Sequence, residues 1–165
     1  MIQLKQIESI TPEALQQLAN DADIAKNLRD VFPHPYSLED ARQFISLVKD
    51  GIVKHVFVIF SDDTFVGLIG IIPQHDVHRF NGEIGYWLGK PFWGKGYATE
   101  AVKQATDFAF NTLGLHRVYA GIFETNKASM RVLDKAGYRL EAVFTSSIIK
   151  NGVLMDEYVY SILKG

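Results

Sequence analysis

The 165-residue sequence contains no cysteine. Disulfide bonds, thiolate nucleophiles and cysteine-based zinc sites are therefore excluded, and the composition fits a reducing compartment, so we expect a cytoplasmic protein. The five histidines do not replace the missing thiols as metal ligands. His75 and His78 share a polar loop, but no further ligand follows at a suitable spacing, so no metal site is predicted.

An excess of either charge is also missing. Seventeen Lys and Arg residues face nineteen Asp and Glu residues, which gives a net charge of −2. Nucleic-acid binders usually carry a basic face, so no nucleic-acid partner is expected. No run approaches the roughly 18 apolar residues that a membrane span needs, and the first residues lack a signal-peptide pattern, so no membrane partner is expected. At this length, with 47% hydrophobic residues, we expect one domain over residues 1–165.

The most informative stretch covers residues 83–106. A β-branched and aromatic run at 83–88 predicts a strand, and apolar residues at helical spacing after Pro91 predict a helix. Between them lies Gly94-Lys95-Gly96, where glycine lets the backbone approach a ligand closely. The free N–H groups and the dipole of a helix N-terminus favour anions, so this turn predicts a phosphate or pyrophosphate site.

The residues around this turn resemble the acetyl-coenzyme A signature of the GNAT superfamily of N-acetyltransferases. In that signature a Gln or Arg is followed by two residues, Gly, any residue, and Gly or Ala. Gly96 and Ala98 fill the last two fixed places, while Trp93 stands where Gln or Arg is usual, as in the RimJ/RimL-like branch that acetylates amino groups. The resemblance implies that acetyl-CoA is bound by Leu88, Trp93, Gly94, Lys95, Gly96, Tyr97, Ala98, Thr99 and Asn126.

The order of predicted elements is β, two helices, a hairpin, a βαβ unit, a helix and a closing hairpin. This order predicts an α/β fold with a mixed, mostly antiparallel sheet and helices on both faces. The predicted strands lie at 2–7, 54–60, 65–72, 83–88, 117–122, 138–149 and 153–163. By resemblance to the GNAT fold, the strands at 83–88 and 117–122 form a central parallel pair that splays apart, with the pantetheine arm between them.

A second motif supplies candidate groups for the leaving thiolate. Asn126-x-x-Ser129, ahead of a helix that ends at Gly137-Tyr138, resembles the family's Asn-x-x-Ser/Ala pattern. Asn126 can cap that helix or bind a pantetheine amide. The family's usual tyrosine general acid is absent, since its position is Leu133 here. Ser129 is the remaining hydroxyl and the predicted proton donor, with local backbone bonding as the alternative.

The incoming amine also needs a base. A protonated amine cannot attack a thioester, and a positioned base typically accelerates such a step by about a hundredfold or more. By resemblance the base is Glu83, at the start of the central strand, and the alternative is an exposed carboxylate at a strand end. Glu141, Asp156 and Glu157 are further candidates. An N–H group near Leu88 would stabilise the oxyanion.

Two other functions compete with an acetyl-CoA-dependent N-acetyltransferase. Gly94-x-Gly96-x-x-Thr99 partly imitates a dinucleotide fingerprint, which would make the protein an NAD-type enzyme, but that fold repeats its βαβ unit. A non-catalytic acyl-CoA-binding module is the other alternative. The amine acceptor, possibly a protein N-terminus, is set by the segments at 30–36 and 73–81, and the protein is expected to be a monomer or a homodimer.

Overall fold

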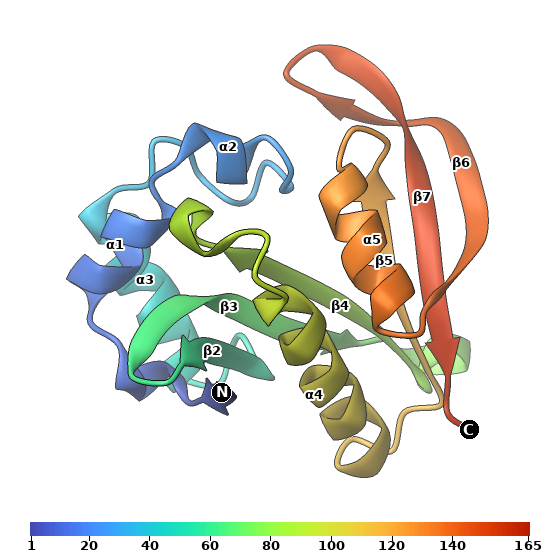
Figure 1. The fold of residues 1–165 in the computed structure, drawn as a ribbon, viewed down its shortest axis with the longest axis horizontal. Coiled ribbons are helices and arrows are strands. Elements are labelled where there is room, and N and C mark those ends of the chain that lie inside the picture. Colours follow the sequence, from blue (N-terminus) through green and yellow to red (C-terminus); the bar gives the residue numbers. More distant parts are fainter.

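The computed structural model describes all residues from 1 to 165, and its centre is one seven-stranded sheet with the order β1-β2-β3-β4-β5-β7-β6 (Figure 1). The strands are β1 (Ile2–Lys5), β2 (Val56–Ser61), β3 (Thr64–Pro73), β4 (Asn81–Leu88), β5 (Arg117–Phe123), β6 (Arg139–Lys150) and β7 (Val153–Leu163). All neighbouring strands are antiparallel except β4 and β5. The predicted α/β fold with one parallel pair is confirmed, and the repeated βαβ units of a dinucleotide-binding fold are not present.

The helices are α1 (Pro12–Ala19), α2 (Ala22–Ala25), α3 (Leu38–Lys49), α4 (Tyr97–Asn111) and α5 (Lys127–Lys135). Short 3-10 turns lie at Ile7–Ser9, Asp76–His78 and Lys90–Phe92. No helix has the length and hydropathy that crossing a membrane requires. The first strand is shorter than predicted, because the chain turns into a 3-10 helix after Gln6.

Local sequence signals explain where several helices begin. The Thr11 hydroxyl accepts a hydrogen bond from the Ala14 N–H at 3.2 Å, and Pro12 follows as the first helical residue of α1. At α3, Ser37 and Asp40 form a capping box, in which each side chain accepts from the other residue's N–H. Such caps satisfy donors that have no partner inside the helix.

Apolar side chains fill a core on each face of the sheet. Ile84 and Leu88 of β4 pack on one face with Ala101 and Val102 of α4, and we call this the α4 face. Trp87 packs on the opposite face, against a core that includes residues of α1 and α3, and we call this the α1–α3 face. Strand residues alternate between faces, so Ile84, Tyr86 and Leu88 share the α4 face, while Glu83, Gly85 and Trp87 share the α1–α3 face.

The central parallel pair parts after three residue pairs. Asn81, Gly82 and Glu83 pair with Arg117, Val118 and Tyr119, and the ladder ends there. β4 stays paired with β3 as far as Leu88, and β5 stays paired with β7 as far as Phe123. Figure 1 shows the two strands diverging toward the end of the sheet near α2. The splay expected from the family resemblance is therefore present.

The splay leaves backbone groups of β4 without a strand partner. The Gly89 N–H donates to Val66 of β3, and the Asn81 carbonyl accepts from Gln74. In an antiparallel ladder this direction alternates from residue to residue, so Trp87 also bonds to β3. The N–H and C=O groups of Tyr86 and Leu88 consequently point into the gap between β4 and β5.

Candidate active site

The turn before α4 has the backbone of an anion-binding loop. Gly94 and Gly96 adopt φ angles of +74° and +81°, in the left-handed region that favours glycine. A Cβ added at either glycine would meet no atom within 4 Å, so the space in front of the turn is open. The first N–H groups of α4 have no intrahelical acceptor and face this space. Phosphate oxygens fit such a helix N-terminus.

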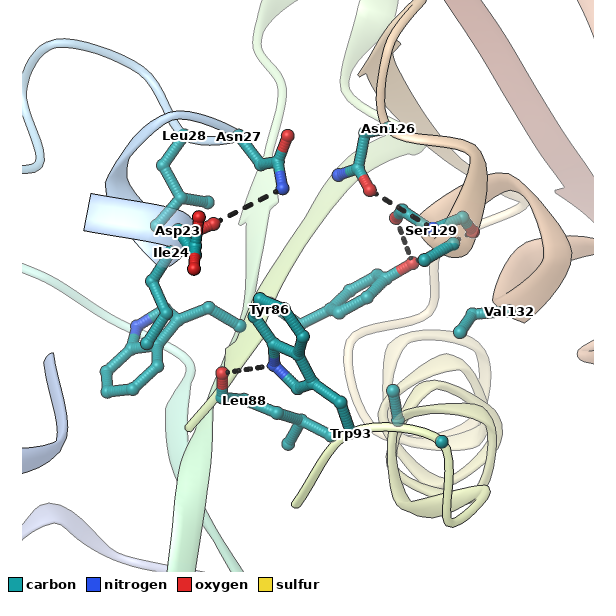
Figure 2. Close-up of a pocket in the computed structure, with 14 residues that line it drawn as sticks. Asp23, Ile24, Asn27, Leu28, Tyr86, Leu88, Trp93, Asn126, Ser129 and Val132 are labelled. Atoms are coloured by element: carbon teal, nitrogen blue, oxygen red, sulfur yellow. Dashed lines mark hydrogen bonds between the residues drawn. The ribbon is translucent and has the colours of Figure 1, made fainter. Parts of the chain in front are cut away.

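Trp93 connects this turn to the end of β4. Its indole Nε1–H donates a hydrogen bond of 2.9 Å to the carbonyl of Leu88, which is one of the groups that point into the gap (Figure 2). This hydrogen bond therefore holds the turn next to the end of β4, where β4 and β5 have separated. This contact gives a structural role to the residue that departs from the usual Gln or Arg of the family signature.

A pocket of about 190 Å³ lies next to the turn and receives groups from β4, α4, α5 and the α2 region (Figure 2). Of the residues predicted to bind acetyl-CoA or to act in catalysis, it is lined by Leu88, Trp93, Gly94, Ala98, Asn126 and Ser129. Lys95, Gly96, Tyr97 and Thr99 do not line it, although they belong to the adjoining turn and the first turn of α4. Glu83 lies outside this pocket, on the α1–α3 face of β4.

Asn126 caps α5, which is one of the two uses predicted for it, and Ser129 meets a second hydroxyl. The Asn126 side chain caps α5 by accepting from the Ser129 N–H at 3.3 Å. The Ser129 hydroxyl, which is buried, shares a hydrogen bond of 2.6 Å with the phenol of Tyr86. Burial raises the pKa of Tyr86, so the phenol keeps its proton at neutral pH.

Tyr86 is a site residue that the sequence analysis missed. The position of the family's usual tyrosine, Leu133, is fully buried in the core, but a phenol reaches Ser129 from β4 instead. The alternation of strand side chains was the available signal, since it places Tyr86 on the same face as Ile84 and Leu88.

Glu83 is held by an arginine. Its carboxylate forms an ion pair with Arg29, from the loop that follows α2. The two side chains differ in exposure, at 18% for Glu83 and 61% for Arg29. Tyr119 is the register partner of Glu83 on β5, and burial together with the Glu83 charge raises the pKa of its phenol.

The three further carboxylates have different surroundings. Glu141 forms an ion pair with Arg117, which lowers the pKa of Glu141. Asp156 accepts a hydrogen bond of 2.8 Å from the Ser146 N–H and supports an irregular part of β6. Glu157 forms no ion pair or side-chain hydrogen bond, and partial burial raises its pKa. Glu157 is thus the unpaired carboxylate of the three.

Three ion pairs hold α2 and the segment that follows it, as far as Asp30, over this region. Asp23 pairs with Lys90 beside the turn, and this contact lowers the pKa of Asp23 to about 2. Asp30 pairs at 2.8 Å with Lys150 at the tip of the β6–β7 hairpin, which bends toward α2 in Figure 1. The Arg29 contact to Glu83 is the third. No cluster of three or more His, Asp or Glu side chains is arranged to hold a metal ion.

Comparison with known proteins identifies the family. Residues 3–139 match the model of the acetyltransferase (GNAT) domain. The chain is 38% identical over 133 residues to the probable N-acetyltransferase YjcK of Bacillus subtilis, covering 78% of this chain and 74% of that protein. The chain therefore belongs to the GNAT acetyltransferase family and is an acetyl-CoA-dependent N-acetyltransferase.

Two solved structures show the same fold. One is the ribosomal L7/L12 alpha-N-protein acetyltransferase RimL in complex with coenzyme A, with a TM-score of 0.82, 22% identity and coverage of 98% of this chain and 93% of that one. The other is a spermidine N-acetyltransferase from Vibrio cholerae in complex with CoA and spermine, with a TM-score of 0.79, 21% identity and coverage of 99% and 94%. The RimJ/RimL-like resemblance is confirmed at the level of the fold.

The open space in front of Gly96 gives a direct test of the cofactor site. Gly96→Val places a branched side chain where the phosphates are expected, so acetyl-CoA should no longer stabilise the fold. For the wild type, acetyl-CoA at a hundredfold above its Kd should add about 2.7 kcal/mol to the free energy of unfolding, while NAD should add none. Thermal unfolding with each ligand measures both effects.

Gly114→Val is the matched control for this variant. Gly114 also has a positive φ, of +68°, and open space around its Cβ position, but it lies beyond the other end of α4. Both variants should lose stability because valine is strained there, and only Gly114→Val should keep the acetyl-CoA shift. An undiminished shift in Gly96→Val would refute the proposed phosphate position.

Proposed function

We propose that this protein transfers the acetyl group of acetyl-CoA to a primary amine, either the α-amine of a protein N-terminus or an amine of a small molecule, by direct attack in a ternary complex. The observation that carries the proposal is the gap between β4 and β5. This gap opens next to the anion-binding turn at Gly96, and the last paired residue before it is Glu83. A thioester in the gap can be reached from both faces of the sheet.

In this proposal the turn and the gap bind the two halves of acetyl-CoA. The pyrophosphate lies at the N-terminus of α4, where the free N–H groups and the helix dipole favour negative charge. The pantetheine arm lies between β4 and β5 and hydrogen-bonds the unpaired backbone groups of Tyr86. The Leu88 N–H stabilises the oxyanion of the tetrahedral intermediate.

Proton transfers complete the reaction. Glu83 takes a proton from the acceptor ammonium, and the free amine attacks the thioester carbonyl carbon. Attack leaves a second proton on the nitrogen, which passes to water, and when the tetrahedral intermediate collapses, the C–S bond breaks and the thiolate leaves. Ser129 gives its proton to this thiolate and is resupplied by Tyr86, to which it is hydrogen-bonded at 2.6 Å. Tyr86 takes a proton back from water and Glu83 releases its proton to water, which restores the starting state. The products are the N-acetylated amine and coenzyme A.

Binding without catalysis is the alternative. A module that only binds acyl-CoA needs the turn and the gap, but it has no use for a buried hydroxyl pair at the thioester. The Ser129–Tyr86 contact on one face and the mostly buried Glu83 on the other therefore favour an enzyme. The two fold relatives act on a ribosomal protein N-terminus and on spermidine, and both kinds of amine are candidate acceptors here.

A turnover screen tests the proposal. Purified protein is incubated with acetyl-CoA and a panel of peptides and small amines, and the release of free thiol is measured. We expect release above the rate of spontaneous hydrolysis with at least one amine, together with the acetylated product by mass spectrometry. Binding of acetyl-CoA without transfer to any amine in the panel would favour the non-catalytic module.

The role of Glu83 predicts a particular pH profile. Glu83→Gln keeps the shape of the side chain and removes the base, so turnover at neutral pH should fall by about a hundredfold or more. The loss should shrink at high pH, because the free amine is then abundant without a base. Affinity for acetyl-CoA should be nearly unchanged. If the variant keeps most of its activity at every pH, Glu83 is structural, and Glu141, Asp156, Glu157 or a water becomes the candidate base.

The Ser129–Tyr86 pair predicts non-additive losses. Ser129→Ala and Tyr86→Phe should each lower kcat by about tenfold, and the double variant should be little worse, because groups that act as one unit do not contribute independently. Tyr138→Phe is the control, since Tyr138 forms a similar buried contact of 2.6 Å with Thr106, and neither residue lines the pocket next to the turn. Additive losses, or an equal loss in Tyr138→Phe, would assign the pair a packing role.

A further inference from the structure

A positively charged side chain of the protein, that of Arg29, lies on the α1–α3 face beside the gap between β4 and β5. Arg29 reaches Glu83 from a loop 54 residues earlier in the sequence. Its side chain is 61% exposed, so the guanidinium can leave into solvent without disturbing a core. Glu83 is only 18% exposed and belongs to the sheet, so the carboxylate stays in place. The arginine is therefore the partner that can leave the ion pair.

A second carboxylate faces the same side of the gap. Glu157 of β7 lies over Gly121 of β5, and a Cβ added at Gly121 would come within 2.6 Å of Glu157 Oε2. Gly121 and Gly85 each lie two residues beyond the last paired residues, Tyr119 and Glu83, and share their face. Because glycine has no side chain, neither position covers the gap on this face. The carboxylates of Glu83 and Glu157 lie on either side of it.

The charges of this face are incompletely balanced. Glu83 is paired with Arg29, and Glu157 has no ion pair of its own. Arg29 and Glu83 both influence the pKa of Glu157, in opposite directions, so the three groups are near neighbours electrostatically. A primary ammonium resembles the guanidinium in being a cation that donates several hydrogen bonds. An acceptor that contacts Glu83 Oε1 must therefore take the position that the guanidinium now holds.

We propose that Arg29 is an internal competitor of the acceptor ammonium for Glu83, and that Glu157 is the second carboxylate that holds the acceptor once Arg29 has left. This inference rests on the proposed function, because it assigns the acceptor to the α1–α3 face of the gap. Arg29 is then a specificity-determining residue, since only amines that outcompete its guanidinium reach the thioester. Glu157 is a positioning residue for the acceptor, while Glu83 takes the proton.

The proposal predicts opposite effects on the acceptor KM. The acceptor binds only those molecules in which Arg29 has left Glu83, so its apparent affinity falls in proportion to the fraction of such molecules. An exposed ion pair of about 1 kcal/mol corresponds to a factor of about five in this affinity. Arg29→Ala should thus lower the acceptor KM by about fivefold. Glu157→Gln should raise it by about tenfold with a smaller change in kcat. Gly121→Ala, whose methyl group displaces the Glu157 carboxylate, should act like Glu157→Gln.

Arg42→Ala is the matched control. Arg42 is also an exposed arginine in an ion pair, with Glu39 on α3, but that pair belongs to the first turns of α3 and has no contact with the gap. It should leave the acceptor KM unchanged. A rise or no change in KM for Arg29→Ala would overturn the role of Arg29 as a competitor, and an unchanged KM in Glu157→Gln and Gly121→Ala would overturn the role of Glu157.

Methylguanidinium provides a binding test that does not depend on turnover. In Arg29→Ala it should occupy the vacated position and shift the backbone amide signals of Gly85 and Gly121 in NMR spectra, while the wild type and Arg42→Ala should show no such shifts. It should also inhibit Arg29→Ala competitively against the amine. These shifts without any acetyl transfer would support the cation site and contradict the proposed function. Acetyl transfer without these shifts would support the function and overturn the inference.

Discussion

The early end of the parallel ladder between β4 and β5 is the constraint on which the site depends. Each strand is held on its outer side, β4 by β3 and β5 by β7, so neither can close the gap after Glu83 and Tyr119. Buried backbone groups without partners are costly, and a ligand that runs between the strands can satisfy them. The open ladder therefore both creates the gap and favours an extended, amide-containing ligand such as the pantetheine arm.

The alternation of side chains along β4 divides the chemistry between two faces. Tyr86 points to the α4 face, where it meets Ser129 on α5, and Glu83 points to the α1–α3 face, where it meets Arg29. In the proposed reaction the amine loses its proton on one face and the thiolate gains one on the other. One strand thus positions both Glu83 and Tyr86, and a register slip of one residue would exchange their faces.

Local signals made part of this site predictable. The turn at Gly96 and the caps at Thr11 and Ser37 involve residues that are close in sequence, so their geometry follows from residue type. The splay was expected only through the resemblance to the GNAT family. Contacts between distant segments were missed, notably Tyr86 with Ser129 and Arg29 with Glu83, because periodicity does not reveal which elements meet. The catalytic roles of Glu83 and Ser129, the cytoplasmic location and the oligomeric state stay predictions.

Amide hydrogen exchange along β4 tests most directly whether acetyl-CoA lies in the gap. The N–H groups of Tyr86 and Leu88 point into the gap, while the N–H of Trp87 between them bonds to β3 and serves as an internal control. We predict that saturating acetyl-CoA slows exchange at Tyr86 and Leu88 by about tenfold and changes Trp87 much less. Unchanged exchange at Tyr86 and Leu88 in protein that binds acetyl-CoA would contradict the account, because the cofactor would then lie elsewhere.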